Sequence, residues 1–470
     1  MKKLIALLLA LVMVIGLAAC SVEKAPAETP AEKPAETPAE TPAETPAETP
    51  AETPAETPAE PAAATEITLW TFPIGKWGDQ ATVDTLMANF EAETGIKVKV
   101  EYLDYQTGDD KVNTAIEGGV APDVIMEGPE RLVTNWGAKG LMVDMSDMLD
   151  ETDLAELNAD LLSSCYGADG ALYEYPLVAN AFCMAINKTV FEAAGAMQYL
   201  NAETHTWNSV EDFFKAIDAV YAHTGKQVAA VFCAGQGGDQ GTRELVKNIG
   251  GGNLTDAAHT TYTWNEEANI NALKAIYDCE GIAFDPSIVG GEEIALFYNG
   301  TLNVAFCWNV GQQQDPNTAG TGAGKTANGD EILFMAFPAA EGTNVRLGVG
   351  EWGFGIFNNG DEARIEAAKA FVKYFADSAA TADAVRAANY FAVRTAAEGT
   401  DLSGIWAENE IMNEYNTIMP LAADYYQVTP GWAEARTNWW NMLQEVGASD
   451  GSIEAITEIV NTRCDMANGK

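Results

Sequence analysis

The chain has 470 residues, of which 26 are basic and 69 acidic, and a formal net charge of −43 at pH 7. This charge excludes nucleic acid as a partner, because phosphate binding needs a basic surface. It also disfavours polyanionic ligands, unless a local basic pocket overrides the overall field.

Residues 1–20, MKKLIALLLALVMVIGLAAC, have a basic start, a short apolar run and small residues before a cysteine. This order is typical of an export signal, and the apolar run is too short for a membrane span. The ending LAAC resembles a bacterial lipobox, which implies that Cys20 receives lipid and becomes the new N-terminus. The alternative is an ordinary cleaved signal with an incidental cysteine.

Residues 26–61, within the segment 21–65, repeat PAET with a period of four and cannot bury enough apolar area to fold. With proline at every fourth residue the segment should be a semi-extended, disordered tether that reaches roughly 140 Å at about 3.1 Å per residue. It is either a spacer that crosses a cell wall or a linker with no particular length requirement.

Residues 66–470 form a segment that is too long for a single hydrophobic core and has a length typical of two lobes. They contain no second run of eighteen apolar residues, which predicts a soluble domain outside the cell. Six cysteines remain after Cys20, none of them in CxxC spacing, and most lie in apolar runs such as AFCMAI and VAFCWN. We expect mostly free, buried thiols, although an even number in an exported chain also permits disulfides.

Strand and helix patterns alternate from residue 66 onward. EITLWTF reads as a strand, and a helix follows with Val83, Leu86, Met87 and Phe90 on one face and Gly95 at its end. IKVKVEY is a second strand, DDKVNTAIEGG a second helix, and APDVIM a short buried strand. This βαβαβ order predicts an α/β fold with a parallel sheet, whose ligands gather at the carboxyl ends of the strands.

Aromatic and acidic residues lie at those carboxyl ends. Trp70, Phe72 and Trp77 occur around the end of the first strand, and Glu127 and Glu130 follow the APDVIM strand. Aromatic platforms beside carboxylates suit a sugar, because a pyranose has a weakly polar face that stacks on a ring and hydroxyls that pair with polar groups.

The competing class is an enzyme, such as a secreted glycoside hydrolase, whose cleft also combines aromatics with paired carboxylates. The chain has three histidines and lacks HExxH and GxSxG patterns, and GGDQGTRE and GTGAGKTANG lack phosphate-loop spacing. A wall-attached adhesion protein would explain the tether but not a cleft.

An ordered series of patterns carries a family resemblance: ITLWTF, FExxTGIKV, APDVI, ALYEYPLVANAFCMAINKTVFEAAG, TWNSVEDFFKA and NGTLNVAFCWN. Together they are similar to the extracellular solute-binding proteins of ABC importers, in the branch that includes maltodextrin-binding and glycerol-3-phosphate-binding proteins. The similarity runs from about residue 66 to the C-terminus.

The resemblance implies two α/β lobes with a ligand cleft between them. Lobe one would comprise residues 66–177 and 348–378, and lobe two residues 178–347 and 379–470. In lobe two, Asn208 with Glu211 and Ser209 with Asp212 are both capping-box patterns. Residues 363–377 should form a helix of the returning lobe-one segment, and Ile453, Ile456, Ile459 and Val460 should line another.

By the same resemblance, ligand contacts are expected from the strand ends, the crossing segment and the aromatics of lobe two: Trp70, Phe72, Trp77, Glu127, Glu130, Arg131, Asn180, Trp308, Asn309, Glu351 and Trp352, with Tyr175 and Trp432 as further candidates. Each has a structural alternative, such as core packing for the tryptophans and solvated or helix-capping roles for the carboxylates. Arg131 and Lys76 are the chief basic residues among these positions, which argues against a phosphate ester.

The functional expectation is a non-enzymatic, lipid-anchored receptor on the outer face of a membrane, in a Gram-positive bacterium. It would be a monomer that captures a neutral mono- or oligosaccharide and delivers it to the membrane permease of an ABC importer, without a cofactor or a metal. A non-sugar solute such as glycerol-3-phosphate or a polyamine is the alternative within the same fold.

Overall fold

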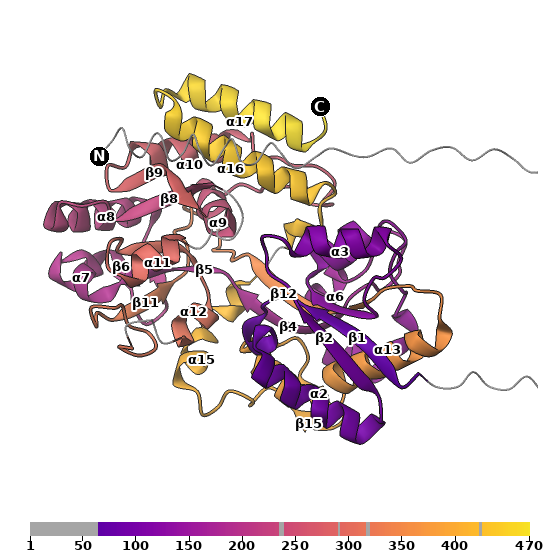
Figure 1. Cartoon of the computed structure of the whole chain (residues 1–470). Coiled ribbons are helices and arrows are strands. Elements are labelled where there is room, and N and C mark those ends of the chain that lie inside the picture. The colour runs from indigo at the N-terminus through magenta and orange to yellow at the C-terminus, as the bar shows by residue number, and fades with distance from the viewer. Residues whose placement is uncertain (1–63, 235–238, 290–291, 316–319, 423–424) are drawn as a thin grey trace, which may run out of the picture. The chain divides into compact units, whose positions relative to one another are not determined.

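A computed structural model describes residues 64–234, 239–289, 292–315, 320–422 and 425–470 (Figure 1). The export signal expected at 1–20, with Cys20, and nearly all of the tether at 21–65 lie outside the described residues.

The first lobe is built on a six-stranded sheet in the order β13-β4-β12-β3-β1-β2. Strand β1 pairs in parallel with β2 and β3, and β12 runs antiparallel between β3 and β4. The strands are β1 (Glu66–Thr71), β2 (Lys97–Tyr102), β3 (Val124–Glu127), β4 (Tyr175–Ala181), β12 (Val349–Ile356) and β13 (Phe391–Ala392). The predicted βαβαβ start is confirmed, with antiparallel strands added beside β3.

Helices α2 (Gln80–Thr94), α3 (Gly108–Glu117) and α13 (Glu362–Ala376) belong to this lobe (Figure 1), as does α14 (Thr381–Ala388). The side chain of Asp79 caps α2 by accepting from the Thr82 amide, and Gly95 ends it in the left-handed conformation. The predicted apolar face of α2 is buried, and Phe90 packs edge-on against Phe371 of α13. Ala384, Val385 and Ala388 of α14 are also buried in this core, so the boundary expected at residue 378 falls just before a helix that packs with the first lobe.

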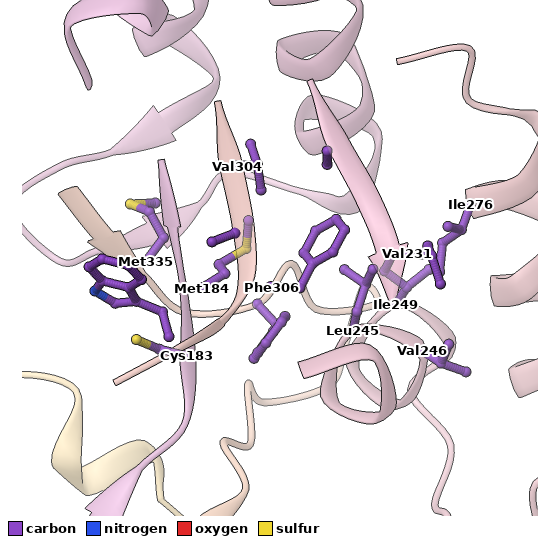
Figure 2. Close-up of a cluster of buried hydrophobic side chains, with 14 of the residues drawn as sticks. Cys183, Met184, Val231, Leu245, Val246, Ile249, Ile276, Val304, Phe306 and Met335 are labelled. Atoms are coloured by element: carbon purple, nitrogen blue, oxygen red, sulfur yellow. The ribbon is translucent and has the colours of Figure 1, made fainter. Parts of the chain in front are cut away.

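The second lobe has an antiparallel sheet in the order β10-β5-β11 and a parallel pair of β8 and β9. Their bounds are β5 (Cys183–Asn187), β8 (Ala229–Ala234), β9 (Ile282–Val289), β10 (Val304–Trp308) and β11 (Ile332–Met335). The longer helices are α8 (Val210–Thr224), α9 (Asp239–Gly250), α10 (Glu267–Asp278), α16 (Trp432–Ala448) and α17 (Ile453–Ala467). Figure 2 shows part of the second core, where Met184, Phe306 and Leu245 bring together β5, β10 and α9.

Local sequence signals account for the helix ends in the second lobe. The side chain of Ser209 accepts from the Asp212 amide at 3.0 Å and caps α8, as one of the two predicted capping patterns requires. Ile456 and Val460 of α17 are buried, which agrees with its predicted apolar face.

Shorter elements complete the described chain. They are α4 (Pro129–Arg131), α5 (Glu151–Glu156), α6 (Ala159–Ser164), α7 (Lys188–Ala193), α11 (Glu292–Tyr298), α12 (Val310–Gln314), α15 (Glu410–Tyr415), β6 (Leu200–Asn201), β7 (Thr206–Trp207), β14 (Ala396–Ala397) and β15 (Thr400–Asp401). The 3-10 turns include η1 (Gly75–Gly78) and η6 (Tyr426–Val428).

The chain crosses between the lobes where β4 of the first sheet leads, after Phe182 alone, into β5 of the second. It crosses back between β11 and β12. The two crossing segments meet, because the Phe182 amide donates to the Gly348 carbonyl at 2.9 Å.

Cys165, Cys183, Cys279, Cys307 and Cys464 are free and buried, so the prediction of buried thiols is confirmed for these five. Within the described ranges, no helix combines the length and apolar character that a membrane crossing requires.

Candidate functional site

A cavity of about 260 Å³ lies between the two lobes. It is lined from both sides by Pro73, Ile74, Tyr105, Glu127, Glu130, Arg131, Phe182, Gln240, Arg243, Asn309, Gln312, Trp352, Tyr390, Gln427, Trp432 and Arg436. A neighbouring hollow of about 340 Å³ shares Glu130, Arg131, Trp432 and Arg436 with it. The two together form a cleft between the lobes, in the position that the fold predicts for a ligand.

The first-lobe wall is organised around Arg131, which is 6% exposed. Its Nε and Nη2 donate to Asp109 at 2.6 and 3.1 Å, and its Nη1 donates to Glu127 at 3.1 Å and Glu130 at 3.2 Å. Three carboxylates therefore hold one guanidinium in place, and the wall has a surplus of negative charge. The sequence places them there because Glu127 ends β3 and Glu130 and Arg131 form α4 directly after it.

An aromatic pair supports the same guanidinium. The ring of Phe72 stacks on Tyr105 at 5.2 Å, and the Arg131 guanidinium lies 5.1 Å from the Phe72 ring. Burial raises the pKa of Glu127 to about 8, although the nearby Arg131 acts to lower it. Both oxygens of Glu127 accept hydrogen bonds, Oε1 from Arg131 and Oε2 from the Gly128 amide.

The second-lobe wall has the opposite balance, with two guanidiniums for one carboxylate. Asp239 of α9 pairs with Arg243 one turn later and accepts from Arg436 of α16 at 2.9 and 2.7 Å. Burial raises the pKa of Asp239, but Arg243 and Arg436 outweigh this effect and hold it far below its usual range. The Arg243 guanidinium lies 4.7 Å from the Trp432 ring, which fixes a flat face at the cavity.

The remaining lining is aromatic and amide. Trp352 stacks on Tyr390 at 4.8 Å with an angle of 15° between the rings, and Phe182 meets Trp352 edge-on at 6.4 Å. Four carboxamides, those of Gln240, Asn309, Gln312 and Gln427, line the cavity from the second-lobe side. Flat apolar faces beside neutral and charged hydrogen-bonding groups suit a solute that has both weakly polar faces and hydroxyls.

Among the residues expected at the ligand from the sequence, Glu127, Glu130, Arg131, Asn309 and Trp352 line the cavity, as does the further candidate Trp432. Phe72 is fully buried behind Arg131 and Tyr105 and supports the wall from behind.

Two expected tryptophan contacts need correction, because the structure places both rings inside hydrophobic cores. Trp77 is fully buried, packs edge-on against Phe354 and Phe375, and donates from Nε1 to the Ala384 carbonyl at 3.1 Å. Trp308 is likewise fully buried against Phe297 and donates to Gln313 at 2.9 Å. Each ring faces inward because its strand or turn end is covered by another helix of the same lobe.

Four other expected residues also lie outside the cavity lining. Trp70 is half-buried on β1 with the Lys111 ammonium 5.3 Å from its ring, and Tyr175 donates to Asp153 at 3.4 Å. Glu351 is buried and accepts from the Ser164 hydroxyl at 2.5 Å. Asn180 is also buried, on β4, opposite Gly350 of β12.

The inward position of Trp77 predicts a stability effect. Replacing Trp77 with Phe should lower the free energy of unfolding by about 1–2 kcal/mol, because the hydrogen bond to Ala384 and part of the buried volume are lost. Urea denaturation would measure this loss. An unchanged midpoint would show that the ring is not packed as the structure has it.

Several residues that line the cavity were not predicted from the sequence. Tyr105 follows the carboxyl end of β2, so the rule that nominated Glu127 could have found it. Arg243 and Arg436 lie in helices far apart in the sequence, where their charges suggest solvent exposure. Phe182, Gln240, Gln312, Tyr390 and Gln427 carry no signal that separates them from ordinary core or loop residues.

In the described ranges of the chain, no group of three or more His, Cys, Asp or Glu side chains is placed to hold a metal ion.

Comparisons with known proteins agree with this architecture. A family model described as bacterial extracellular solute-binding protein matches residues 85–414. A search of curated proteins finds no match.

Solved structures with the same fold have low sequence identity to this chain. The GacH receptor of Streptomyces glaucescens, solved unliganded and with acarbose, is 18% identical with a TM-score of 0.66 and covers 87% of this chain and 100% of its own. A putative oligosaccharide-binding protein from Synechococcus is 16% identical with a TM-score of 0.68, covering 86% and 99%. The substrate-binding protein Lmo0181 from Listeria monocytogenes, in complex with cycloalternan, is 16% identical with a TM-score of 0.66, covering 86% and 98%.

The family match spans well over half of the chain, and the fold of this chain is the fold of these structures. This chain therefore belongs to the family of bacterial extracellular solute-binding proteins.

Proposed function

We propose that this protein is the receptor of an ABC importer and captures a neutral sugar or oligosaccharide in the cleft between its lobes. The observation that carries the proposal is the composition of the cavity wall. It combines the Trp352–Tyr390 stack and Trp432 with guanidiniums and carboxylates that are already paired with one another. Because the charges compensate each other, the wall offers hydrogen bonds without requiring a charged ligand.

The solved structures support a saccharide. The GacH receptor was crystallised with acarbose and the Listeria protein with cycloalternan, and both share the fold of this chain. A phosphate ester such as glycerol-3-phosphate is less suitable, since every guanidinium of the lining is already paired with a carboxyl group. Arg131 pairs with three carboxyl groups, and Arg243 and Arg436 both pair with Asp239.

Hydrolysis of the bound sugar would need two carboxyl groups on opposite sides of a glycosidic bond. The carboxyl groups of the lining, Glu127 and Glu130, accept from the same Arg131 nitrogen, at 3.1 and 3.2 Å, and so lie on one wall. Asp239 of the opposite wall is buried behind the lining and is held by Arg243 and Arg436. This arrangement favours binding over catalysis.

The mechanism follows from the two walls. Open lobes admit the sugar, closure buries it between the aromatic faces, and the closed form docks on a membrane permease. The chain is a monomer anchored on the outer face of the membrane by lipid at Cys20, and the PAET segment is its tether.

The proposal is tested by thermal unfolding of the chain from residue 21 onward against maltose, maltotriose, monosaccharides, glycerol-3-phosphate, amino acids and polyamines. One saccharide class should raise the melting temperature by several degrees, because ligand that binds only the folded state stabilises it. Replacing Trp352 with Ala should weaken binding about tenfold, since it removes a stacking face.

A shift with only a phosphate ester or a polyamine would keep the receptor fold and overturn the saccharide. Recovery of a cleaved sugar would favour a hydrolase.

A further inference from the structure

Two consecutive tyrosines send their hydroxyls into different lobes. Tyr425 donates to Oε2 of Glu130 in the first lobe at 2.6 Å, and Tyr426 donates to Oε1 of Glu244 in the second lobe at 2.9 Å. Tyr425 packs against the first core, whereas Tyr426 is 2% exposed within the second. Tyr426 begins η6, which contacts α4 of the first lobe, and Gln427 of the same turn lines the cavity.

Both hydroxyls are linked to guanidiniums of the cavity wall, that of Tyr425 through Glu130 and that of Tyr426 directly. The other oxygen of Glu130 accepts from Arg131 at 3.2 Å, so Tyr425 is part of the first-lobe network. The Tyr426 hydroxyl accepts from Nε of Arg243 at 3.2 Å, so Tyr426 is part of the second-lobe network. The backbone between the two tyrosines therefore joins the two charged walls of the cleft.

The contact between Tyr425 and Glu130 is tightly packed against Gly128 and β12. A Cβ atom added to Gly128 would lie 2.7 Å from Oε2 of Glu130, 3.3 Å from the Tyr425 oxygen and 2.6 Å from the carbonyl oxygen of Glu351. A side chain at Gly128 would meet the backbone of β12 at Glu351, so glycine keeps the space beside Glu130 and Tyr425 free. Burial, together with Glu130 for one and Glu244 for the other, raises the pKa of both hydroxyls well above the usual range, so both remain donors.

We propose that Tyr425 and Tyr426 form an interlobe clasp, which sets the separation of the lobes and holds Glu130 and Arg243 in position for the ligand. They are positioning residues, because they act through Glu130 and Arg243. The effect on ligand affinity rests on the proposed function, whereas the effect on lobe separation does not.

The clasp is tested with Tyr425→Phe and Tyr426→Phe in the chain from residue 21 onward. Tyr173→Phe is the matched control, because the Tyr173 hydroxyl also donates to a carboxylate, that of Asp169, at 2.6 Å, and Tyr173 does not line the cleft. Spin labels on cysteines introduced at Val120 and Met466, which are 69% and 46% exposed and lie in different lobes, report the lobe separation without any ligand.

We expect each clasp variant to broaden the label distances and shift them to larger values, while Tyr173→Phe leaves them unchanged. The double variant should shift them by less than the sum of the single shifts, because both hydroxyls belong to one clasp. Maltotriose is the probe for affinity, and the Kd of the chain for maltotriose should rise about tenfold in the clasp variants.

Label distances in both clasp variants that match those of Tyr173→Phe would overturn the clasp, whatever the affinity. Broadened distances in a chain that binds no saccharide would support the clasp and count against the proposed function. Both results are read on variants whose circular dichroism matches that of the parent chain.

Discussion

Replacing Arg131 with Ala should lower the free energy of unfolding by about 3–5 kcal/mol, measured by urea denaturation at pH 8. The change leaves Asp109, Glu127 and Glu130 facing one another without their common cation. Removing one partner of a buried ion pair is costly because the remaining charges have lost both their water and their counterion. Glu127 is fully buried, so water cannot take over the role of the guanidinium without a rearrangement of the wall.

Arg386→Ala is the control for this prediction. Arg386 pairs with Asp383 at 3.1 Å, but the two side chains are 52% and 64% exposed. An exposed pair of this kind contributes about 0–1 kcal/mol. If the two variants lost similar amounts of stability, the Arg131 cluster would be far more hydrated than the structure shows.

Stability should fall as the pH rises from about 5 to about 8, and Glu351 should account for part of the fall. Burial raises the pKa of Glu351 to about 8 from an ordinary value of 4.5. Between these two values the folded chain keeps a proton that the unfolded chain releases, so raising the pH favours unfolding. The contribution is on the order of 3 kcal/mol across this range, because each pKa unit corresponds to about 1.4 kcal/mol and neighbouring charges share the effect.

Glu351→Gln isolates this effect. The amide keeps the size of the protonated acid and an oxygen that can accept from Ser164, but it cannot ionise. It gives up only the acceptor of the Cys165 thiol at 3.7 Å, which is a weak donor. The variant should match the parent chain at pH 5 and exceed it in unfolding free energy at pH 8. Glu366→Gln, on a side chain that is 73% exposed, should leave the whole profile unchanged. A Glu351→Gln profile parallel to that of the parent would mean that Glu351 is ionised in the folded protein.

Other buried carboxyl groups act in the same direction. Burial raises the pKa of Glu293 to about 7, although the amides of Phe306 and Cys307 donate to it at 2.7 and 3.2 Å and oppose the shift. Glu293→Gln would lose an acceptor for one of these amides, so it is a poorer probe than Glu351→Gln. Glu351 in the first lobe is therefore a better position than Glu293 for measuring how proton binding changes the free energy of unfolding.

The sequence by itself determined the features that depend on local order. The apolar spacing of Val83, Leu86, Met87 and Phe90 located α2, the Ser209 cap located α8, and the strand–helix alternation indicated the α/β class. The cleft was also predictable in outline, because Glu127, Glu130 and Arg131 directly follow the end of a parallel strand. These features are encoded by neighbours within a few residues, where periodicity and capping are strong signals.

Only the tertiary structure decided which aromatic rings face the ligand space. Trp77 and Trp308 are of the residue type that stacks on a sugar, but they are covered by α14 and α11 of their own lobes. Tyr390, by contrast, stacks on Trp352 from another part of the chain. The second-lobe wall likewise depends on Arg243 and Arg436, which meet at Asp239 although Arg436 is 197 positions away from Asp239 in the sequence. The direction of a side chain at a strand end is set by the packing of distant segments, and a single sequence carries no local signal for it.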